Sequence, residues 1–319
     1  MNNLTLAIIT YKRPKKLKRC LTSILEQTVL PKKVLIIDND KRQTAKGIFK
    51  LFKNKFPIEY AVEKRQGIPN ARNKALKLCK TPLLGFIDDD CVLDKNWVKV
   101  ALQSAKDTRA SYILGKSLLF NKNSIIAFAQ HCRQTYWFFR DLEKNNNLPS
   151  PFNLDTKNVV FKIRFLKKNN IWFDQDLFIH TVGGHADTDL GFQFKNKGLI
   201  GRYEPKMIVY HEEVQRLRDF FKKAYHRGRV GVLLYKKWNL KKELIFLPDI
   251  YLYKWLKRMK CWPDDYKKWT KNIEKNFFIK VVVFLLIKFY DKVYLQGFVD
   301  QSKREKINLA FFYKTYRDL

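Results

Sequence analysis

Short apolar runs alternate with helix-like segments through the first third of the chain, and this alternation constrains the fold more than any other feature. Four runs have the length and the polar flanks of buried strands: 4–10, 34–37, 58–62 and 83–87. Between the first two runs, apolar residues recur at the spacing of one helix face, as Leu17, Leu21 and Ile24 do. Strands that alternate with helices usually pair in parallel within one sheet. The sequence therefore predicts an α/β fold with a mostly parallel central sheet and flanking helices.

Two acidic segments follow strands of this predicted sheet, one at 38–40 (Asp-Asn-Asp) and one at 88–90 (three Asp). Sheets of this kind bind ligands at the carboxyl ends of their strands. Carboxylates two residues apart can hold Mg²⁺ or Mn²⁺ beside a diphosphate, because these ions take oxygen ligands and keep substrate phosphates in their shell. An ordinary Asx-turn at 38–40 and an acidic helix N-cap at 88–90 are the alternatives.

Three further segments place polar residues where a site would need them. Gly67 and Arg72 frame a loop that enters a helix, a position where an anion can bind. Asp187 and Asp189 begin a later helix and could supply a base for an acceptor hydroxyl. His211 follows an apolar run and could serve as a third metal ligand. A surface loop, an acidic first turn and a structural histidine explain the same segments equally simply, so their order along the chain matters more.

The chain carries 64 Lys and Arg against 30 Asp and Glu, a net charge of +34. Such an excess attracts partners that bear phosphate: nucleic acid, anionic lipid or a sugar nucleotide. No helix-turn-helix, zinc-finger or RNP-like pattern is found, and acidic strand ends would repel a phosphate backbone. We therefore expect no nucleic-acid partner. The five cysteines form no C-x-x-C pair and fit reduced thiols in the cytoplasm.

Residues 233–319 read as a basic, aromatic, helical tail. Four tryptophans within it suit a lipid headgroup layer: Trp238, Trp255, Trp262 and Trp269. A basic amphipathic segment of this type lies on an anionic membrane, while packing on the rest of the protein is the alternative. The apolar stretch 277–290 contains two lysines and is shorter than the roughly 20 residues of a spanning helix. We expect peripheral association with the inner face of the cytoplasmic membrane.

In chain order, these motifs resemble those of the family 2 glycosyltransferases with the GT-A fold, a Rossmann-like arrangement. Residues 10–14 (Thr-Tyr-Lys-Arg-Pro) resemble the family's "TYNRP", residues 66–76 its "G-x-x-x-ARN-x-x-L", and residues 86–90 its "F-L-D-D-D". Residues 156–158 resemble a "T-x-N" strand beside the acceptor pocket. Residues 210–229 resemble the "YHR…R…GR" stretch of a bacterial branch that makes cell-surface polysaccharides or glycolipids. The likeness covers about residues 4–232, which we predict to be the catalytic domain.

The resemblance implies a nucleotide-sugar donor, most often UDP-linked, bound by six residues: Thr10, Tyr11, Asp38, Asp40, Arg72 and Asp88. A divalent metal, Mn²⁺ or Mg²⁺, would be held by Asp90 together with His211. Asp187 matches the aspartate that acts as catalytic base in inverting members. The acceptor or the diphosphate would lie near Asn158, Asp189 and Arg216.

The implied reaction is a metal-dependent, inverting transfer of the sugar to a hydroxyl of a glycan or lipid-linked acceptor in cell-envelope polysaccharide synthesis. Asp187 would deprotonate the hydroxyl, which attacks the anomeric carbon from the face opposite the nucleotide. Ala186 stands where the family usually has glutamate. A catalytically weak or silent sugar-nucleotide-binding homologue is therefore one alternative, and a basic nucleic-acid-binding protein is another.

Overall fold

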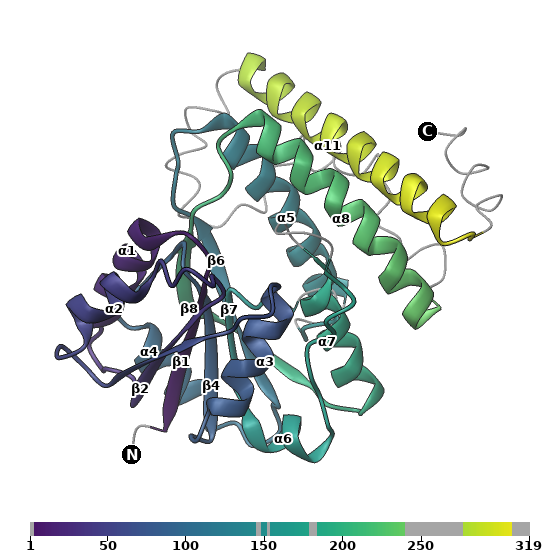
Figure 1. The fold of residues 1–319 in the computed structure, drawn as a ribbon. Coiled ribbons are helices and arrows are strands. Elements are labelled where there is room, and N and C mark those ends of the chain that lie inside the picture. The colour runs from purple at the N-terminus through teal and green to yellow at the C-terminus, as the bar shows by residue number, and fades with distance from the viewer. Residues whose placement is uncertain (1–2, 145–147, 152–153, 179–183, 240–276, 308–319) are drawn as a thin grey trace. The chain divides into compact units, whose positions relative to one another are not determined.

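The computed structural model describes residues 3–144, 148–151, 154–178, 184–239 and 277–307 (Figure 1). The chain divides into two compact units. The first unit comprises residues 1–120, 140–178 and 186–212, and the second comprises 121–139, 179–185 and 213–319.

An eight-stranded sheet forms the centre of the first unit, in the order β3-β2-β1-β4-β7-β6-β8-β5. Its strands are β1 (Leu4–Thr10), β2 (Lys33–Asp38), β3 (Ile58–Val62), β4 (Leu83–Asp88), β5 (Cys91–Leu93), β6 (Tyr112–Leu119), β7 (Asn158–Lys162) and β8 (Gly201–His211). The first four strands pair in parallel, as does β6 with β8, whereas β7 and β5 run antiparallel to their neighbours. The predicted, mostly parallel sheet is confirmed, and its four expected strands are present.

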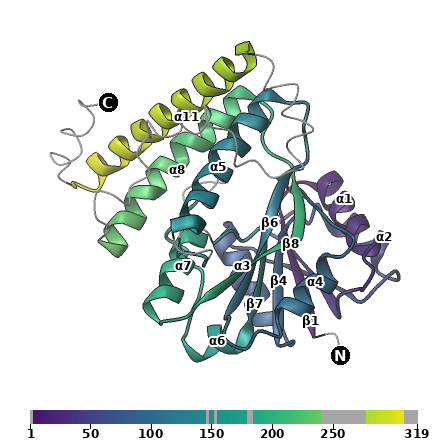
Figure 2. The same cartoon turned by 180° about the vertical axis from the view of Figure 1, so that it is seen from behind.

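Helices cover both faces of this sheet: α1 (Pro14–Leu25), α2 (Lys46–Phe52), α3 (Ile68–Leu78), α4 (Trp97–Ser104), α6 (Ile163–Lys168) and α7 (Ala186–Asn196). Figure 1 shows α3 in front of the sheet, and Figure 2 shows α4 over the opposite face. Alternate residues of β1, such as Leu4 and Leu6, pack with Leu17 and Leu21 of α1 in one buried cluster. The period of two along the strand and the helical spacing of α1 thus meet in one core.

The start of α3 depends on a glycine. Gly67 has a φ of 130°, a backbone conformation that residues with a Cβ rarely adopt. A Cβ there would also lie 3.2 Å from the ring of Phe178. Pro69 follows in the first turn, where its missing N–H leaves no helix bond unmade. The predicted loop-to-helix junction is confirmed.

The second unit contains α8 (Leu217–Trp238), α11 (Phe277–Arg304) and most of α5 (Ile125–Lys144). Figure 1 shows α8 and α11 side by side. They approach closely at two glycines: a Cβ on Gly228 would lie 1.9 Å from the carbonyl oxygen of Tyr294, and one on Gly297 would lie 2.1 Å from that of Tyr225. A buried ion pair, Arg133 to Asp291 at 2.7 Å, joins α5 to α11.

Helix α8 runs through residue 232, so the chain has no structural break where we place the start of the tail. That division by function stays a prediction. Trp255, Trp262 and Trp269 lie outside the described residues, and Trp238 ends α8. Among the helices of the described ranges, none is both long enough and apolar enough to cross a membrane.

Candidate functional site

The carboxyl ends of β2, β1 and β4 lie beside one another because the strands are parallel and in register. Thr10 of β1 is paired with Asp38 of β2, and Ile9 of β1 is paired with Asp88 of β4. The two acidic segments that follow β2 and β4 therefore flank the end of β1, as the sequence predicted.

Three predicted residues converge at this edge. Ligand atoms of Asp88, Asp90 and His211 all lie within 4.8 Å of one another. The short strand β5 makes this possible, because Cys91 pairs with His211 and places it next to Asp90. The Nε2 atom of His211 lies 3.2 Å from Oδ1 of Asp90. Within the described residues, this is the only group of three such side chains.

Basic side chains surround the acidic triplet. Arg13 donates to Asp89 at 3.3 Å and to Asp90 at 3.0 Å, and Lys16 lies 3.6 Å from Asp90. On the other side of the triplet, Arg72 contacts the Asp88 carboxylate at 3.5 Å. The three carboxylates are therefore neutralised mainly by side chains from α1, its N-terminal flank and α3.

Asp89 and Asp90 are both buried, and their neighbours shift the two pKa values in opposite directions. Burial raises the pKa of the Asp89 carboxyl, and the charge of Asp90 adds to the rise. Burial also acts to raise the pKa of Asp90, but His211, Arg13 and Lys16 outweigh it and lower that pKa well below its usual range. Of these two, Asp90 is the carboxylate whose neighbours favour the ionised form.

The residues present fit a divalent cation. Two carboxylates and an imidazole supply hard and borderline ligands at a spacing that one ion can bridge. Asp88 remains partly open, since its side chain is 34% exposed, whereas Asp90 and His211 are buried. A cation held there would have one accessible side for a diphosphate.

The predicted nucleoside contacts differ in what they can offer a ligand. Asp38 is fully buried and accepts hydrogen bonds from the N–H of Ala45 and the hydroxyl of Tyr60, at 2.9 and 2.8 Å. Asp40 has one buried oxygen, Oδ2, that has no hydrogen-bond partner. The N–H of Asp40 donates to Oδ1 of Asp38 at 3.0 Å, and the N–H of Arg42 donates to Oδ1 of Asp40 at 3.1 Å. The Asx-turn alternative therefore holds at both residues, and Oδ2 of Asp40 is the oxygen that is left without a partner.

Thr10 and Tyr11 lie at the end of β1 and just after it. The Thr10 hydroxyl donates to Asp89 at 2.7 Å and is buried. The Tyr11 hydroxyl accepts a hydrogen bond from Gln66 at 3.1 Å, which links the end of β1 to the segment before α3. Tyr11 is partly exposed and lies at the edge where the two acidic segments meet.

The predicted base and acceptor residues are placed differently. Asp187 lies partly exposed in the first turn of α7, where it accepts the N–H of Thr188 at 3.1 Å. Asp189, in the same turn, is fully buried and accepts from Gln193 at 2.8 Å. Arg216 belongs to the second unit and precedes α8.

The side-chain amide of Asn158 is used inside the first unit. It is fully buried, its oxygen accepts the indole N–H of Trp97 at 2.8 Å, and its nitrogen donates to the carbonyls of Lys116 and Met207, both at 2.9 Å. Its amide therefore links β7 to β6 and β8. Its oxygen and nitrogen are already hydrogen-bonded, so neither supports the expected contact with the acceptor substrate.

Sequence reasoning missed Asp89, Arg13 and Lys16 as members of the site. Arg13 stood within the quoted motif at 10–14 but received no role. The sequence feature that indicates a role for Arg13 is its position between a strand end and a helix start, beside a predicted acidic cluster.

Comparisons with known proteins identify the family of the chain and its fold. The sequence model of glycosyl transferase family 2 matches residues 5–168, more than half of the chain. A hyaluronan synthase of Pasteurella multocida is 25% identical over 241 residues, which are 66% of this chain and 24% of that protein. A processive diacylglycerol beta-glycosyltransferase of Mycoplasma genitalium is 28% identical over 181 residues, or 53% of each chain. The chain therefore spans about half or less of these relatives.

Among solved structures, the mannosyltransferase PcManGT from Pyrobaculum calidifontis, in complex with GDP-Man and Mn²⁺, has a similar fold. The TM-score is 0.62 at 14% identity, and the match covers 93% of this chain and 87% of that one. At this identity the likeness concerns the fold alone, and it confirms the predicted GT-A architecture.

Proposed function

This chain belongs to glycosyl transferase family 2, and on that premise we propose that it transfers a sugar from a nucleotide-diphosphate donor to a hydroxyl of a glycan or lipid-linked acceptor. The observation that carries the proposal is the convergence of Asp88, Asp90 and His211 at adjoining strand ends. The hyaluronan synthase similarity favours a role in cell-envelope polysaccharide synthesis.

The donor is proposed to bind across the ends of β2, β1 and β4. The unpaired oxygen of Asp40 would accept a hydrogen bond from the base, and Tyr11 would lie against the nucleoside. The proposed nucleotide is UDP. GDP is the alternative, because the similar mannosyltransferase structure contains GDP-Man.

A divalent cation held by Asp88, Asp90 and His211 would neutralise charge on the leaving diphosphate. We expect Mn²⁺ rather than Mg²⁺, since Mg²⁺ demands near-ideal oxygen coordination and an imidazole is present. Arg13, Lys16 and Arg72 already surround the carboxylates. Their N–H groups can turn to the phosphate oxygens when the sugar nucleotide binds, because guanidinium and ammonium groups pair with carboxylates and with phosphates.

Asp187 is the proposed base. Its carboxylate takes the proton of the acceptor hydroxyl while that oxygen forms a bond to the anomeric carbon. The bond from the anomeric carbon to the diphosphate oxygen breaks on the opposite face, so the configuration inverts. A partly exposed carboxylate in the first turn of α7 supports this role, because an acceptor can reach it.

Binding of UDP, GDP and dTDP by calorimetry, with and without Mn²⁺, tests the donor site. We expect Mn²⁺-dependent binding of one nucleotide that the double variant Asp88→Ala/Asp90→Ala loses. Glu59→Gln, a surface carboxylate on β3, is the matched control and should bind as the wild type does. Failure of the wild type to bind any of the three would overturn the proposal.

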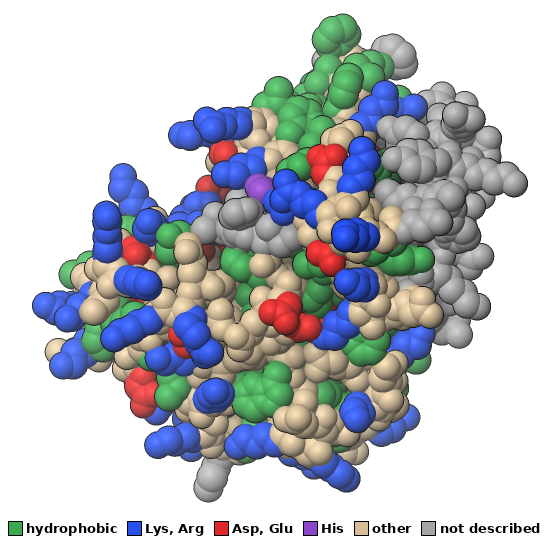
Figure 3. Space-filling view, turned by 45° about the vertical axis from the view of Figure 1, so that its right-hand side comes forward, with side chains coloured by type: hydrophobic (Ala, Val, Ile, Leu, Met, Phe, Trp, Pro, Cys, Tyr) green, Lys and Arg blue, Asp and Glu red, His purple; other side chains and the backbone are tan. Residues whose placement is uncertain are grey.

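We also propose that the protein works at an anionic membrane surface. Helix α11 supports this, because it is apolar on both sides of its first half. One side is buried in the second unit, whereas the opposite side exposes a stripe of four residues: Phe278 (76%), Val281 (37%), Leu285 (45%) and Phe289 (53%). Figure 3 shows hydrophobic side chains gathered at the top of the view, where α11 begins.

Charge favours lipid over a second copy of the chain as the occupant of this stripe. Lys288 and Lys292 are exposed beside it, at the positions where they would meet headgroup phosphates. Two copies that each carry a net charge of +34 would repel one another. A helix that buries one face in protein and exposes apolar residues on the other is suited to lie in the interface.

A further inference from the structure

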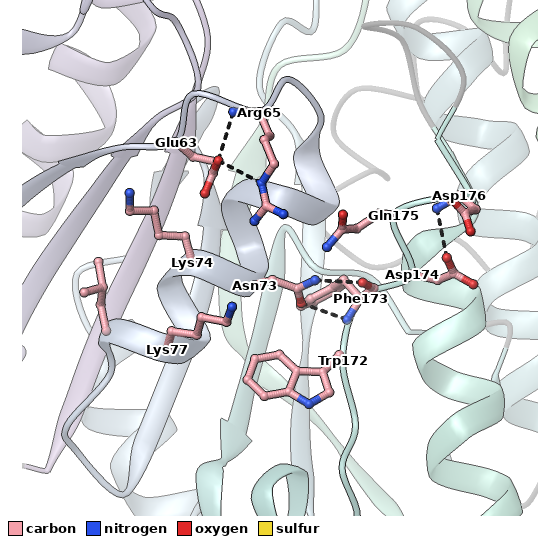
Figure 4. A pocket seen from close by; sticks show the side chains of 11 residues that line it. Glu63, Arg65, Asn73, Lys74, Lys77, Trp172, Phe173, Asp174, Gln175 and Asp176 are labelled. Carbon is pink, nitrogen blue, oxygen red and sulfur yellow. Dashed lines mark hydrogen bonds and ion pairs between the residues drawn. The ribbon is translucent and has the colours of Figure 1, made fainter.

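A pocket lies in the first unit, between α3 and the segment 172–176, and is separate from the acidic edge of the sheet (Figure 4). Its volume is about 780 Å³, within the range of small-molecule sites. None of the residues that line it belongs to the acidic triplet or to the residues paired with it. The proposed reaction therefore leaves this pocket unused.

Two side-chain amides hold the pocket's loop in place. Asn73 of α3 donates to the carbonyl of Phe173 at 2.8 Å and accepts its N–H at 2.9 Å. Gln193 of α7 donates to the carbonyl of Trp172 at 2.9 Å. The backbone at 172–173 is thus fixed from two helices, so the Trp172 side chain has a preformed position.

The indole of Trp172 lines the pocket as an anchored ring. Its only polar atom, Nε1, donates to Asn170 at 2.8 Å. The Lys77 ammonium lies 5.9 Å from the ring centroid (Figure 4). What the ring adds to the pocket is therefore carbon surface, bordered by polar groups.

Those polar groups are of both signs. Arg65, Lys74 and Lys77 offer only donors; Glu63, Asp174 and Asp176 offer only acceptors; Gln175 offers both. An anionic ligand would face the carboxylates, and a cationic ligand would face the lysines and the arginine. A hydrocarbon would take water away from these charged groups and give them no new hydrogen bond, which is unfavourable.

A neutral pyranose meets all of these requirements, since it has an apolar C–H face for the indole and a rim of hydroxyls that both donate and accept. We propose that this pocket binds a neutral pyranose unit of the acceptor glycan. This rests on the proposed function for its biological meaning. The same two helices support both sites: α3 carries Asn73 beside Arg72, which contacts Asp88, and α7 carries Gln193 and the proposed base Asp187.

A printed array of neutral and acidic oligosaccharides, read with the labelled 319-residue chain, tests the assignment. We expect binding to a subset of the neutral oligosaccharides. Calorimetry on the strongest of them should show at least a tenfold loss of affinity for Trp172→Ala and for Gln175→Ala. Gln175 is exposed, so its replacement should leave the fold intact. Trp172→Phe should retain most of the binding, because it keeps an aromatic face.

Two controls separate this pocket from the donor site. Phe120→Ala removes an exposed aromatic outside the pocket and should change nothing. Asp88→Ala/Asp90→Ala should keep glycan binding while losing nucleotide binding, so a failed donor site and a failed pocket are distinguishable. No binding by the wild type, binding to acidic glycans alone, or unchanged binding by both pocket variants would each overturn the proposal.

Discussion

The Nε2 atom of His211 lies 3.2 Å from Oδ1 of Asp90, and the contact joins the last residue of β8 to the residue before β5. The antiparallel pair Cys91–His211 sets that distance through the backbone, so the two side chains meet before any ion binds.

Replacing His211 should therefore weaken metal binding without unfolding the first unit. We expect His211→Ala to bind Mn²⁺ at least tenfold more weakly, because one of three ligands is lost. Titration of Mn²⁺ by electron paramagnetic resonance measures this. His226→Ala, in the second unit, is the control. An unchanged Mn²⁺ affinity in His211→Ala would remove the histidine from the metal site.

Arg13 should stabilise the protein most when no metal is bound. Arg13→Ala leaves Asp89 and Asp90 with less compensating charge, and we expect a loss of roughly 1 kcal/mol because the arginine is half exposed. Added Mn²⁺ should raise the Tm of this variant more than that of the wild type, since the ion replaces the missing charge. If Mn²⁺ raised the Tm of the variant and of the wild type equally in thermal unfolding, the ion and the Arg13 guanidinium would not neutralise the same carboxylates.

Replacing the proposed base should separate chemistry from binding. Asp187→Asn should abolish sugar transfer while the Kd for the nucleotide changes little, because an amide cannot take the proton. The wild type should also hydrolyse the sugar nucleotide slowly when no acceptor is present.

If the wild type binds the nucleotide but neither transfers the sugar nor hydrolyses the sugar nucleotide, the protein is a catalytically silent homologue. Ala186, which stands in place of the usual glutamate, is consistent with that outcome.

His185 should make the protein less stable in mild acid. Burial, followed by the charges of Arg227 and Arg133, lowers its pKa to about 3. Below the ordinary pKa of about 6.5 the unfolded chain takes up a proton that the folded protein refuses, so stability falls as pH drops from about 6.5 towards 3. The limiting slope is about 1.4 kcal/mol per pH unit. Urea unfolding between pH 4.5 and 7.5 should show a shallower slope for His185→Gln; equal slopes would contradict this account.

The exposed stripe on α11 should determine vesicle binding. Phe278→Ser with Phe289→Ser should lower co-sedimentation with vesicles of phosphatidylglycerol and phosphatidylcholine by at least tenfold, because most of the exposed aromatic area is lost. Leu51→Ser with Ile200→Ser removes exposed apolar residues from the first unit and should have no effect. Loss of folding in the α11 variant would mean instead that part of this chain covers the stripe.

The strands and the acidic edge of the sheet could be predicted because they depend on local patterns. The run at 4–10 has the bounds of β1, and the triplet at 88–90 lies at the end of β4. His211 was predicted for the same reason, since it ends an apolar run.

What could not be predicted depends on contacts between distant segments. Nothing local distinguishes Asp38, whose Oδ2 accepts from Ala45 and Tyr60, from Asp40, whose Oδ2 has no partner. The buried role of Asn158 required the position of Trp97. Helix α11 extends to Arg304, beyond the stretch at 277–290, because its later turns pack on α8 through buried residues such as Phe298.

Gly228 and Gly297 have a further consequence for the second unit. Any other residue at either position would place its Cβ against the backbone of the opposite helix. A shift of α11 by one turn, or a rotation about its axis, would bring such a residue into the contact and cause a collision. The rotational setting of α11 is therefore locked, and with it the direction in which Phe278 and Phe289 point. The lack of a side chain at these two glycines thus determines which side of α11 is exposed.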